Sequence, residues 1–400
     1  MRITTNGSLY MYKHNLTNVS NSLYTSMNKI LSKRNFDSYS ANPAGATRAF
    51  NIHSSLNAVR TQSSNNESVL SKLETAWSIE DDVLNELTHD LAEAPALGGL
   101  NGTNLDSLES YSKIIRSGAE SIVQSMNGKY ANKFIFNGAE TDEPPFAIET
   151  DLAQQPPRDC LTFRGWRVDV PNNQEPYRNL EGKLMYEDAN GDVVPVPDSE
   201  LVDGELKPGS TIQLFTNADA LAELNSMADE SLFVDIGLGF RLDEDGEVID
   251  STAFDSALSG LNFLGFGTDK DGDPKNIVSI MLKISDIFGE YEHNPDDSTK
   301  STWGPSGDYE DACRLTSKFT DAQAYLSEQH TSLSAQGTYL ETNQKRLDDT
   351  FFNLNSERST IEDCDPADAI TEYMAVNTCY QAALQVGTNV IPQSLMDYLR

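Results

Sequence analysis

Apolar residues recur every seven positions along both ends of this 400-residue chain, and polar residues fill most positions between them. Residues spaced by seven share one face of a helix, so each row predicts a long helix with a narrow apolar stripe. The C-terminal row comprises Phe319, Leu326, Leu333, Leu340, Leu347, Leu354 and Ile361. The N-terminal row comprises Ala49, Leu56, Ser63, Leu70, Trp77, Leu84 and Leu91, and a second row follows three residues on at Ile52, Val59, Asn66, Leu73, Glu80 and Leu87.

A shorter helix is predicted before the N-terminal row, and another is predicted after the C-terminal row. The first covers about residues 7–32 and carries Leu9, Leu16, Leu23 and Ile30 at the same spacing. The last follows residue 366 and carries Ile370, Asn377, Leu384, Ile391 and Tyr398. A further helix is predicted at about 105–133. Narrow stripes bury too little surface to hold single helices in water, so we expect these helices to pack on one another or on other subunits.

Two Pro-containing pairs predict where helices begin. Asn42 is expected to cap the helix that opens at Pro43, and Asp365 to cap the helix that opens at Pro366. Asn and Asp side chains accept hydrogen bonds from the first free backbone N–H groups of a helix. Pro suits the first helical position, where its missing N–H group is not needed.

The middle of the chain has a different composition. Residues 140–311 hold 38 Asp and Glu against 11 Lys and Arg, together with 12 of the 16 prolines. Alternation around 166–170, 212–214 and 232–240 predicts strands, and the spacing at 276–288 predicts a helix. The charge and the proline content therefore place a boundary at each side of an acidic, strand-rich insert.

The predicted fold class is α+β, in which N- and C-terminal long helices pair into an α-helical coiled-coil stalk that carries the insert. We expect residues 1–42 and 365–400 to be assembly helices that are disordered in the monomer, and 43–139 with 312–364 to form the coiled-coil domain. Residues 140–311 would form the outer domain. The predicted assembly interface comprises Leu9, Leu16, Leu23, Ile30, Leu56, Leu70, Trp77, Leu84, Leu326, Leu333, Leu340, Leu347, Leu354, Ile370, Leu384, Ile391 and Leu395.

Charge and motif content exclude several classes of function. A formal net charge of -33 argues against binding to nucleic acid or to anionic membranes. No apolar run is long enough for a membrane span, and the start of the chain shows no secretory signal. Cys160, Cys313, Cys364 and Cys379 have no zinc-ligand spacing, so we expect free thiols. No catalytic, cofactor-binding or metal-binding motif is recognised, which predicts a protein that is not an enzyme.

One acidic turn leaves an alternative open. Asp269, Asp271 and Asp273 place three carboxylates on alternate residues, as calcium-binding loops do. Pro274 stands where such a loop needs Gly, and the final bidentate Glu is missing. A solvated turn is therefore the preferred interpretation, and a calcium-dependent adhesin or an enzyme in the insert is the distant alternative.

Short motifs at both ends of the chain resemble the bacterial flagellin superfamily. They are MRIT at 1–4, SANPAGA at 40–46, FIFNGAET at 134–141, YQAAL at 380–384 and LMDYLR at 395–400. The family loop usually reads Ser-Asp-Asp-Pro, whereas Ala41 and Asn42 replace both aspartates here. Within the superfamily, the exit at 134–141 is more similar to hook-associated proteins than to filament flagellins.

This resemblance implies a structural protein of the bacterial flagellum that joins the hook to the flagellin filament. Its implied partners are like subunits in a ring or layer, a neighbouring hook-associated protein on the hook side, flagellin on the filament side and a cytosolic export chaperone. It implies export through the flagellar type III system without a cleaved signal peptide, to an extracellular position. Filament flagellin itself is the alternative within the same class.

Overall fold

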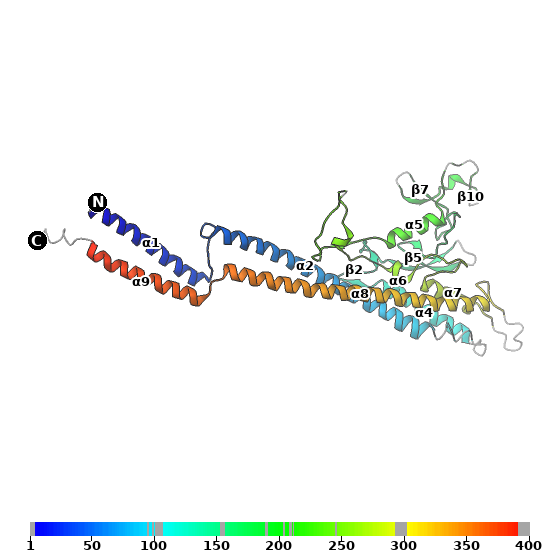
Figure 1. Ribbon diagram of the computed structural model, residues 1–400. Coiled ribbons are helices and arrows are strands. Elements are labelled where there is room, and N and C mark those ends of the chain that lie inside the picture. Colours follow the sequence, from blue (N-terminus) through cyan, green and yellow to red (C-terminus); the bar gives the residue numbers. More distant parts are fainter. Residues whose placement is uncertain are drawn as a thin grey trace. The chain divides into compact units, whose positions relative to one another are not determined.

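The computed structural model describes residues 5–93, 96–97, 100, 107–152, 157–188, 191–202, 205–207, 210, 212–244, 246–292 and 302–390. Long helices dominate both ends of the chain (Figure 1). The helices are α1 (Thr5–Ser32), α2 (Pro43–Asp81), which continues as the π-helical η1 (Asp82–Glu93), α4 (Leu108–Met126), α5 (Asn217–Ala228), α6 (Gly260–Leu264), α7 (Ile277–Gly289), α8 (Tyr309–Glu362) and α9 (Pro366–Val390).

The strands are short and antiparallel. They are β1 (Lys129–Tyr130), β2 (Lys133–Phe134), β3 (Asn137–Gly138), β4 (Phe146–Asp151), β5 (Arg158–Phe163), β6 (Trp166–Arg167), β7 (Met185–Glu187), β8 (Val193–Pro195), β9 (Leu201–Val202), β10 (Glu205–Leu206), β11 (Phe233–Val234), β12 (Phe254–Asp255) and β13 (Leu258–Ser259). The largest sheet has the order β4-β5-β6, with Phe146 opposite Phe163. The predicted α+β fold class is therefore confirmed.

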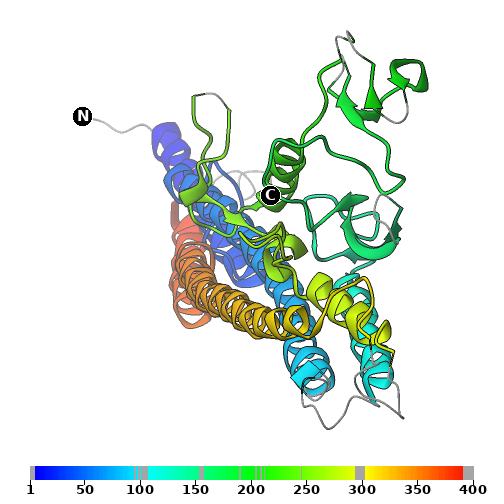
Figure 2. The ribbon, with the colours of Figure 1, turned by 90° about the vertical axis from the view of Figure 1, so that its right-hand side faces the viewer.

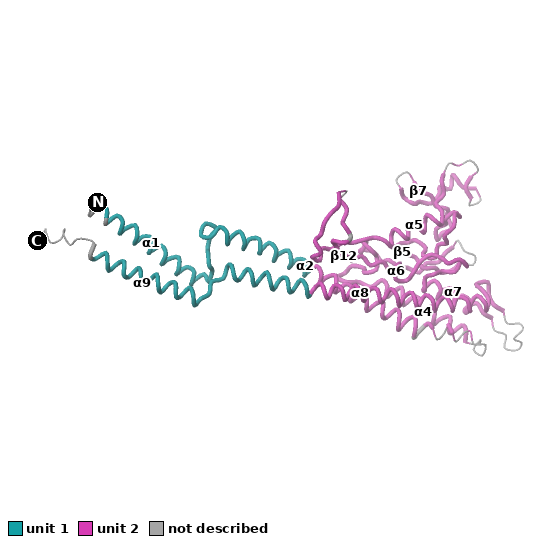
Figure 3. Tube along the Cα trace, in the orientation of Figure 1, with its two compact units in different colours: residues 1–64, 345–400 teal, residues 65–344 magenta. Residues whose placement is uncertain are grey.

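The chain divides into two compact units, drawn in different colours in Figure 3. Unit 1 comprises residues 1–64 and 345–400, and unit 2 comprises residues 65–344. Helices α2 and α8 each contribute one part to either unit. The predicted three-part division, with boundaries at 42, 139, 311 and 364, stays a prediction.

Unit 2 holds the larger apolar core. Helices α4 and α7 lie side by side (Figures 1 and 2), and α7 is buried on nearly every face. Asn276 caps α7 by accepting hydrogen bonds from the N–H groups of Val278 and Ser279. The predicted helix at 276–288 is thus present. The bulkiest fully buried side chains of the described residues include Phe136, Phe146, Phe163, Phe288 and Phe319.

Two buried amides join α2 to α8 inside unit 2. Asn343 Nδ2 donates to Asn66 Oδ1 at 2.8 Å and to the Ile236 carbonyl at 2.9 Å. Asn66 Nδ2 donates in turn to the Leu340 carbonyl at 3.0 Å. A buried, satisfied Asn pair is favourable only when both helices keep one alignment, so it fixes their register.

A second polar pair between α2 and α8 lies about four helical turns away, and it is not satisfied. Glu80 of α2 is only 4% exposed, and its Oε2 lies 3.6 Å from Nδ1 of His330 on α8. Neither atom has a hydrogen-bond partner. The indole of Trp77 packs against the His330 ring with 4.9 Å between ring centroids. Burial raises the pKa of Glu80 to about 8 and lowers the pKa of His330.

Several predicted elements are shorter than expected. The helix predicted at 105–133 ends at Met126, because the Asn127 side chain pairs with both backbone groups of Phe146 on β4, at 2.8 and 3.0 Å. Ala131 and Asn132 then take positive φ and form a tight turn between β1 and β2. Of the strands predicted at 166–170 and 232–240, only the two-residue strands β6 and β11 are present. In the predicted strand at 212–214, Leu214 forms an isolated β-bridge with Tyr186.

Candidate assembly surface

Helices α1 and α9 form an antiparallel pair within unit 1. The Tyr12 hydroxyl donates to the Ala383 carbonyl at 3.0 Å, and the Lys29 ammonium lies 3.1 Å from a Glu372 carboxylate oxygen. Gly387 has no side chain at the place where the Tyr12 ring crosses α9, and a Cβ there would collide with that ring. The packing of the Tyr12 ring against α9 therefore depends on this glycine.

The predicted row on α1 faces its partner helix only in part. Leu16, Leu23 and Ile30 are half-buried, and Leu9 is exposed. The row one residue further on lies outside the pair. It comprises Tyr10, Thr17, Tyr24 and Leu31, and Tyr10 is 75% and Leu31 73% exposed. We call these four residues the outer row of α1.

Helix α9 has the same division. Ala369 and Gly387 are buried against α1, and Tyr373, Val376 and Tyr380 are half-buried. The predicted residues Ile370 and Leu384 are exposed instead. Ile391 and Leu395 lie outside the described residues, as do the motifs at 1–4 and 395–400. Large apolar side chains left uncovered on both helices mark this pair as the candidate assembly surface.

The predicted rows on α2 and α8 are covered by the chain itself over much of their length. The predicted interface residues that are buried are Leu56, Leu326, Leu333, Leu340 and Leu347, and those that are half-buried are Leu70, Leu84 and Leu354. Trp77 alone among the predicted residues of α2 and α8 is exposed, at 41%. The role of these residues in assembly stays a prediction, and the uncovered side chains place most of the candidate surface on α1 and α9.

A short link joins the two helix pairs of unit 1. The Asn35 N–H donates to the Glu362 carbonyl at 2.8 Å, and the Cys364 N–H donates to the Lys33 carbonyl at 3.0 Å. Asn42 Oδ1 accepts from the Gly45 N–H at 3.0 Å at the start of α2, and Asp365 Oδ1 accepts from the Ala367 N–H at 2.8 Å at the start of α9. Pro43 and Pro366 are the first residues of their helices.

Replacing the α2 cap should have a modest and local effect. In Asn42→Ala the Gly45 N–H loses its acceptor, and we expect unit 1 to lose about 1 kcal/mol of unfolding free energy. Hydrogen exchange at the amides of the first turn of α2 measures the change. Asn42→Asp keeps the acceptor and should retain the protection, so equal loss in both variants would contradict the capping role.

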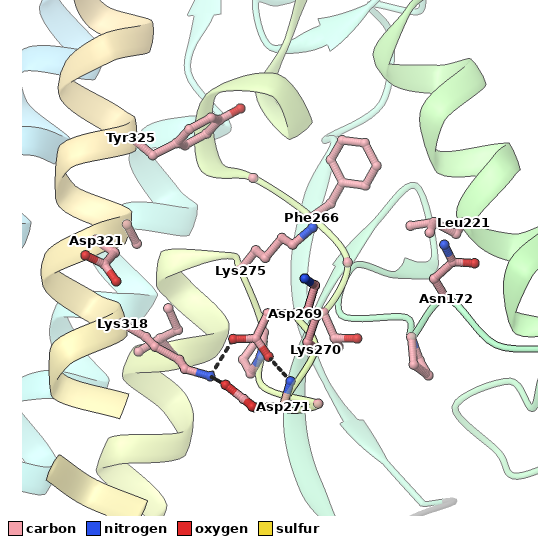
Figure 4. A pocket seen from close by; sticks show the side chains of 18 of the residues that line it. Asn172, Leu221, Phe266, Asp269, Lys270, Asp271, Lys275, Lys318, Asp321 and Tyr325 are labelled. Atoms are coloured by element: carbon pink, nitrogen blue, oxygen red, sulfur yellow. Dashed lines mark hydrogen bonds and ion pairs between the residues drawn. The ribbon is translucent and has the colours of Figure 1, made fainter. Parts of the chain in front are cut away.

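The acidic turn of unit 2 holds a lysine ammonium among its carboxylates. Lys318 Nζ of α8 contacts Asp269 and lies 3.1 Å from Asp271 Oδ2 (Figure 4). It also lies 2.8 Å from Asp273 Oδ2. Arg314 Nε adds a contact of 2.7 Å to Asp273. Each of the three carboxylates of the turn is therefore already paired with a cation of α8. The turn forms one wall of an open groove of about 1240 Å³, which also includes Tyr325.

Metal sites, membrane-spanning helices and disulfide bonds were also considered for the described residues. Within the ranges described, no group of His, Cys, Asp and Glu could hold a metal ion. Among the same residues, no helix combines the length and the apolar character needed to cross a membrane. The four cysteines are free thiols, as expected, and Cys160 is buried.

Charge is divided unevenly between the segments of the chain. Residues 1–64 contain seven Lys and Arg against one Asp, and no Asp or Glu occurs before Asp37. The four cationic residues between 5 and 36 are Lys13, Lys29, Lys33 and Arg34. Helix α1 is thus a cationic helix in a strongly acidic chain. Neither this cationic character nor the outer row was predicted, although the spacing of Tyr10, Tyr24 and Leu31 is visible in the sequence.

The chain is similar to several flagellar proteins, and its C-terminal helices match one family model. A search of curated protein sequences found no match. Among solved structures, the chain resembles a protein described as a flagellar hook-associated protein from Vibrio parahaemolyticus, at 13% identity over 81% of this chain and 100% of that chain, with a TM-score of 0.46. It also resembles FlgL of Bacillus cereus, at 13% identity over 77% and 99% of the two chains and a TM-score of 0.39. A third similar structure is the flagellar hook-associated protein-3 of Legionella pneumophila. It is 12% identical over 78% of this chain and 98% of that chain, with a TM-score of 0.40. Residues 316–399 match the family model of the bacterial flagellin C-terminal helical region, so the chain is similar to flagellins over α8 from residue 316 and over α9.

Proposed function

We propose that this chain is a structural, non-enzymatic junction protein of the bacterial flagellum that links the hook to the flagellin filament. The observation that carries the proposal is the uncovered apolar surface of α1 and α9, in a chain whose residues 316–399 match flagellins. A single copy leaves these side chains in water, and contact with neighbouring subunits would bury them. Assembly is therefore the role that this surface suits best.

The partners follow from the position of a junction protein. Like subunits would form a ring or layer, with a hook-associated protein on the hook side and flagellin on the filament side. Delivery would use the flagellar type III system, with a cytosolic chaperone that covers the apolar helices before export. The weak pairing of α1 with α9, in which most inner residues are only half-buried, fits helices that become fully ordered when neighbours cover them.

A deletion strain tests this function. We expect bare hooks on the cells and unpolymerised flagellin in the medium, and the wild-type gene should restore filaments. Leu31→Asp places a charge in the outer row and should not restore them. Asn15→Asp adds the same charge on α1 outside the outer row, and it should restore them. Normal filaments on the deletion strain would overturn the proposal.

Purified protein distinguishes the junction role from that of a filament flagellin. A junction protein should form limited assemblies, whereas long filaments grown from this chain alone would favour flagellin. The calcium-dependent alternative is not favoured, because the Lys318 ammonium lies among the three carboxylates that would bind the ion.

A further inference from the structure

Unit 2 carries a small apolar groove between α2 and α8 that no described residue fills. Its volume is about 190 Å³, and its apolar lining comes from Leu70, Leu73 and Trp77 of α2 and from Leu333 and Gly337 of α8. Trp77 stays 41% exposed at its edge. Glu74 and Glu341 form an acidic rim, and both are exposed. No ion pair to either carboxylate is present within the described ranges.

Gly337 has no explanation inside its own chain. Glycine in a helix costs about 1 kcal/mol relative to alanine, so its presence in mid-helix calls for a reason. At Gly387 a Cβ would collide with Tyr12, and at Gly45 it would collide with Asn42. At Gly337 a Cβ would meet nothing within 4 Å. The missing side chain keeps the groove open. An open groove explains the glycine only if a side chain of another molecule binds there.

The charge and shape of the groove select its occupant. An entering helix must present apolar side chains at helical spacing and cationic groups for Glu74 and Glu341. Helix α1 combines these properties: its outer row is exposed and presents Tyr10, Tyr24 and Leu31, the helix has no acidic residue, and Lys13 makes no ion pair within the described residues. Beyond residue 64 the chain is strongly acidic, so surfaces from that part of a second copy would be repelled by the rim.

We propose that this groove binds the outer row of α1 from a second copy of the chain, with an outer-row side chain over Gly337 and cationic groups of α1 at the acidic rim. The inference rests on the proposed assembly function and goes beyond it, because it assigns one defined contact between subunits. The contact would bury the exposed part of Trp77 and fill the groove over Gly337. A buried aromatic side chain beside a filled apolar pocket is typical of the energetically important centre of an interface.

Photo-crosslinking between two copies tests the contact. Full-length protein with benzoylphenylalanine in place of Tyr24 is mixed with a heavy-isotope-labelled copy under conditions in which the wild type self-associates. We expect crosslinks from position 24 to peptides that contain residues 333–341 of the labelled copy. Gly337→Leu in the labelled copy should lower their yield by about tenfold, equivalent to roughly 1.4 kcal/mol of contact energy.

A matched variant keeps the test specific. Ser327→Leu adds the same side chain at an exposed position of α8 outside the groove, and the yield should not change. Leucine favours helix more than glycine does, so Gly337→Leu should fold, and its thermal melting verifies this. Crosslinks that land on α1 or α9 of the second copy would overturn this inference and leave the junction function standing. A wild-type protein that never self-associates would overturn both.

Discussion

Glu80→Gln should raise the free energy of unfolding of unit 2 by roughly 2 to 3 kcal/mol near pH 8. Glu80 is buried, and its Oε2 faces Nδ1 of His330 without a hydrogen bond. Burial raises the pKa of this carboxyl from 4.5 to about 8. A glutamine of the same shape carries no charge at any pH, and its amide can donate to the facing nitrogen. The penalty for ionising a buried carboxyl then disappears.

The sign of the pH dependence follows from the direction of the shift. Below pH 4.5 Glu80 is protonated in both states and has no effect on the pH slope. Between 4.5 and about 8 the unfolded chain releases this proton while the folded chain retains it, so stability falls as pH rises. One unit of pKa corresponds to about 1.4 kcal/mol, and the penalty near neutral pH is on the order of 3 kcal/mol.

His330 makes the free energy of unfolding change with pH in the opposite direction, over a lower and overlapping pH range. Burial lowers its pKa below 6.5, and the nearby Asp81 carboxylate opposes this shift. The contribution of His330 is therefore fully present above pH 6.5 and is lost as pH falls through the lowered value. The wild type should be most stable at mildly acidic pH. Glu80→Gln should instead keep its stability as pH rises above 6.5.

Urea denaturation followed by circular dichroism across this pH range measures both effects. Glu74→Gln is the matched control, because Glu74 is exposed on the same helix and the variant removes the same charge. Its profile should follow that of the wild type. Parallel profiles for wild type and Glu80→Gln would show that Glu80 has the same pKa in the folded and the unfolded chain, and would contradict the prediction.

The heptad spacing predicts which helices form, but it does not predict which neighbour covers them. Residues seven apart share a face in any helix, so the row from Phe319 to Ile361 identified α8 correctly. That row is buried in α8 as far as Leu347, whereas Ile370 and Leu384 of the predicted row in α9 are exposed and Ala369 beside them is buried. The choice between adjacent faces depends on the direction in which the partner helix crosses. Spacing along one helix does not contain that direction.

The acidic insert was harder to predict, because its order comes from contacts between distant residues. Strands of two or three residues, such as β6 and β11, leave almost no alternation to detect. The helix α5 begins at a capping box of Thr216 and Asp219, which was present in the sequence and overlooked. Lys318 lies more than forty positions after the carboxylates that it contacts, so local spacing could show the three carboxylates but not the cation among them.

Lys318→Met should lower the free energy of unfolding of unit 2 by about 2 to 3 kcal/mol at neutral pH. The side chain of Lys318 is 16% exposed, and those of Asp273 and Asp269 are 8% and 28% exposed. Removing the ammonium leaves these carboxylates close together with Arg314 as the remaining cation on Asp273. Asp271 is 68% exposed, so water screens its contribution, and the estimate lies below the range for fully buried pairs.

The deficit of Lys318→Met should shrink as the pH falls toward 4. Burial raises the pKa values of Asp269 and Asp273, but hydrogen bonds, from Lys318 to both and from Arg314 to Asp273, outweigh it and hold both below 3.8. In the wild type this stabilisation is present above pH 3.8 and is lost as pH falls through the lowered values. In the variant the crowded carboxylates take up protons more readily, so acid relieves their repulsion.

Lys270→Met is the matched control for this variant. Lys270 lies in the same turn, is exposed and makes no ion pair within the described residues, so its loss removes one positive charge without breaking a contact. Thermal melting of the wild type and both variants at neutral and mildly acidic pH separates the cases. Equal melting temperatures for the two variants, or a deficit of Lys318→Met that persists in acid, would show that the ammonium does not hold the turn on α8. A deficit confined to Lys318→Met at neutral pH means that α8, the helix that also carries Gly337, is anchored to the insert by this cation.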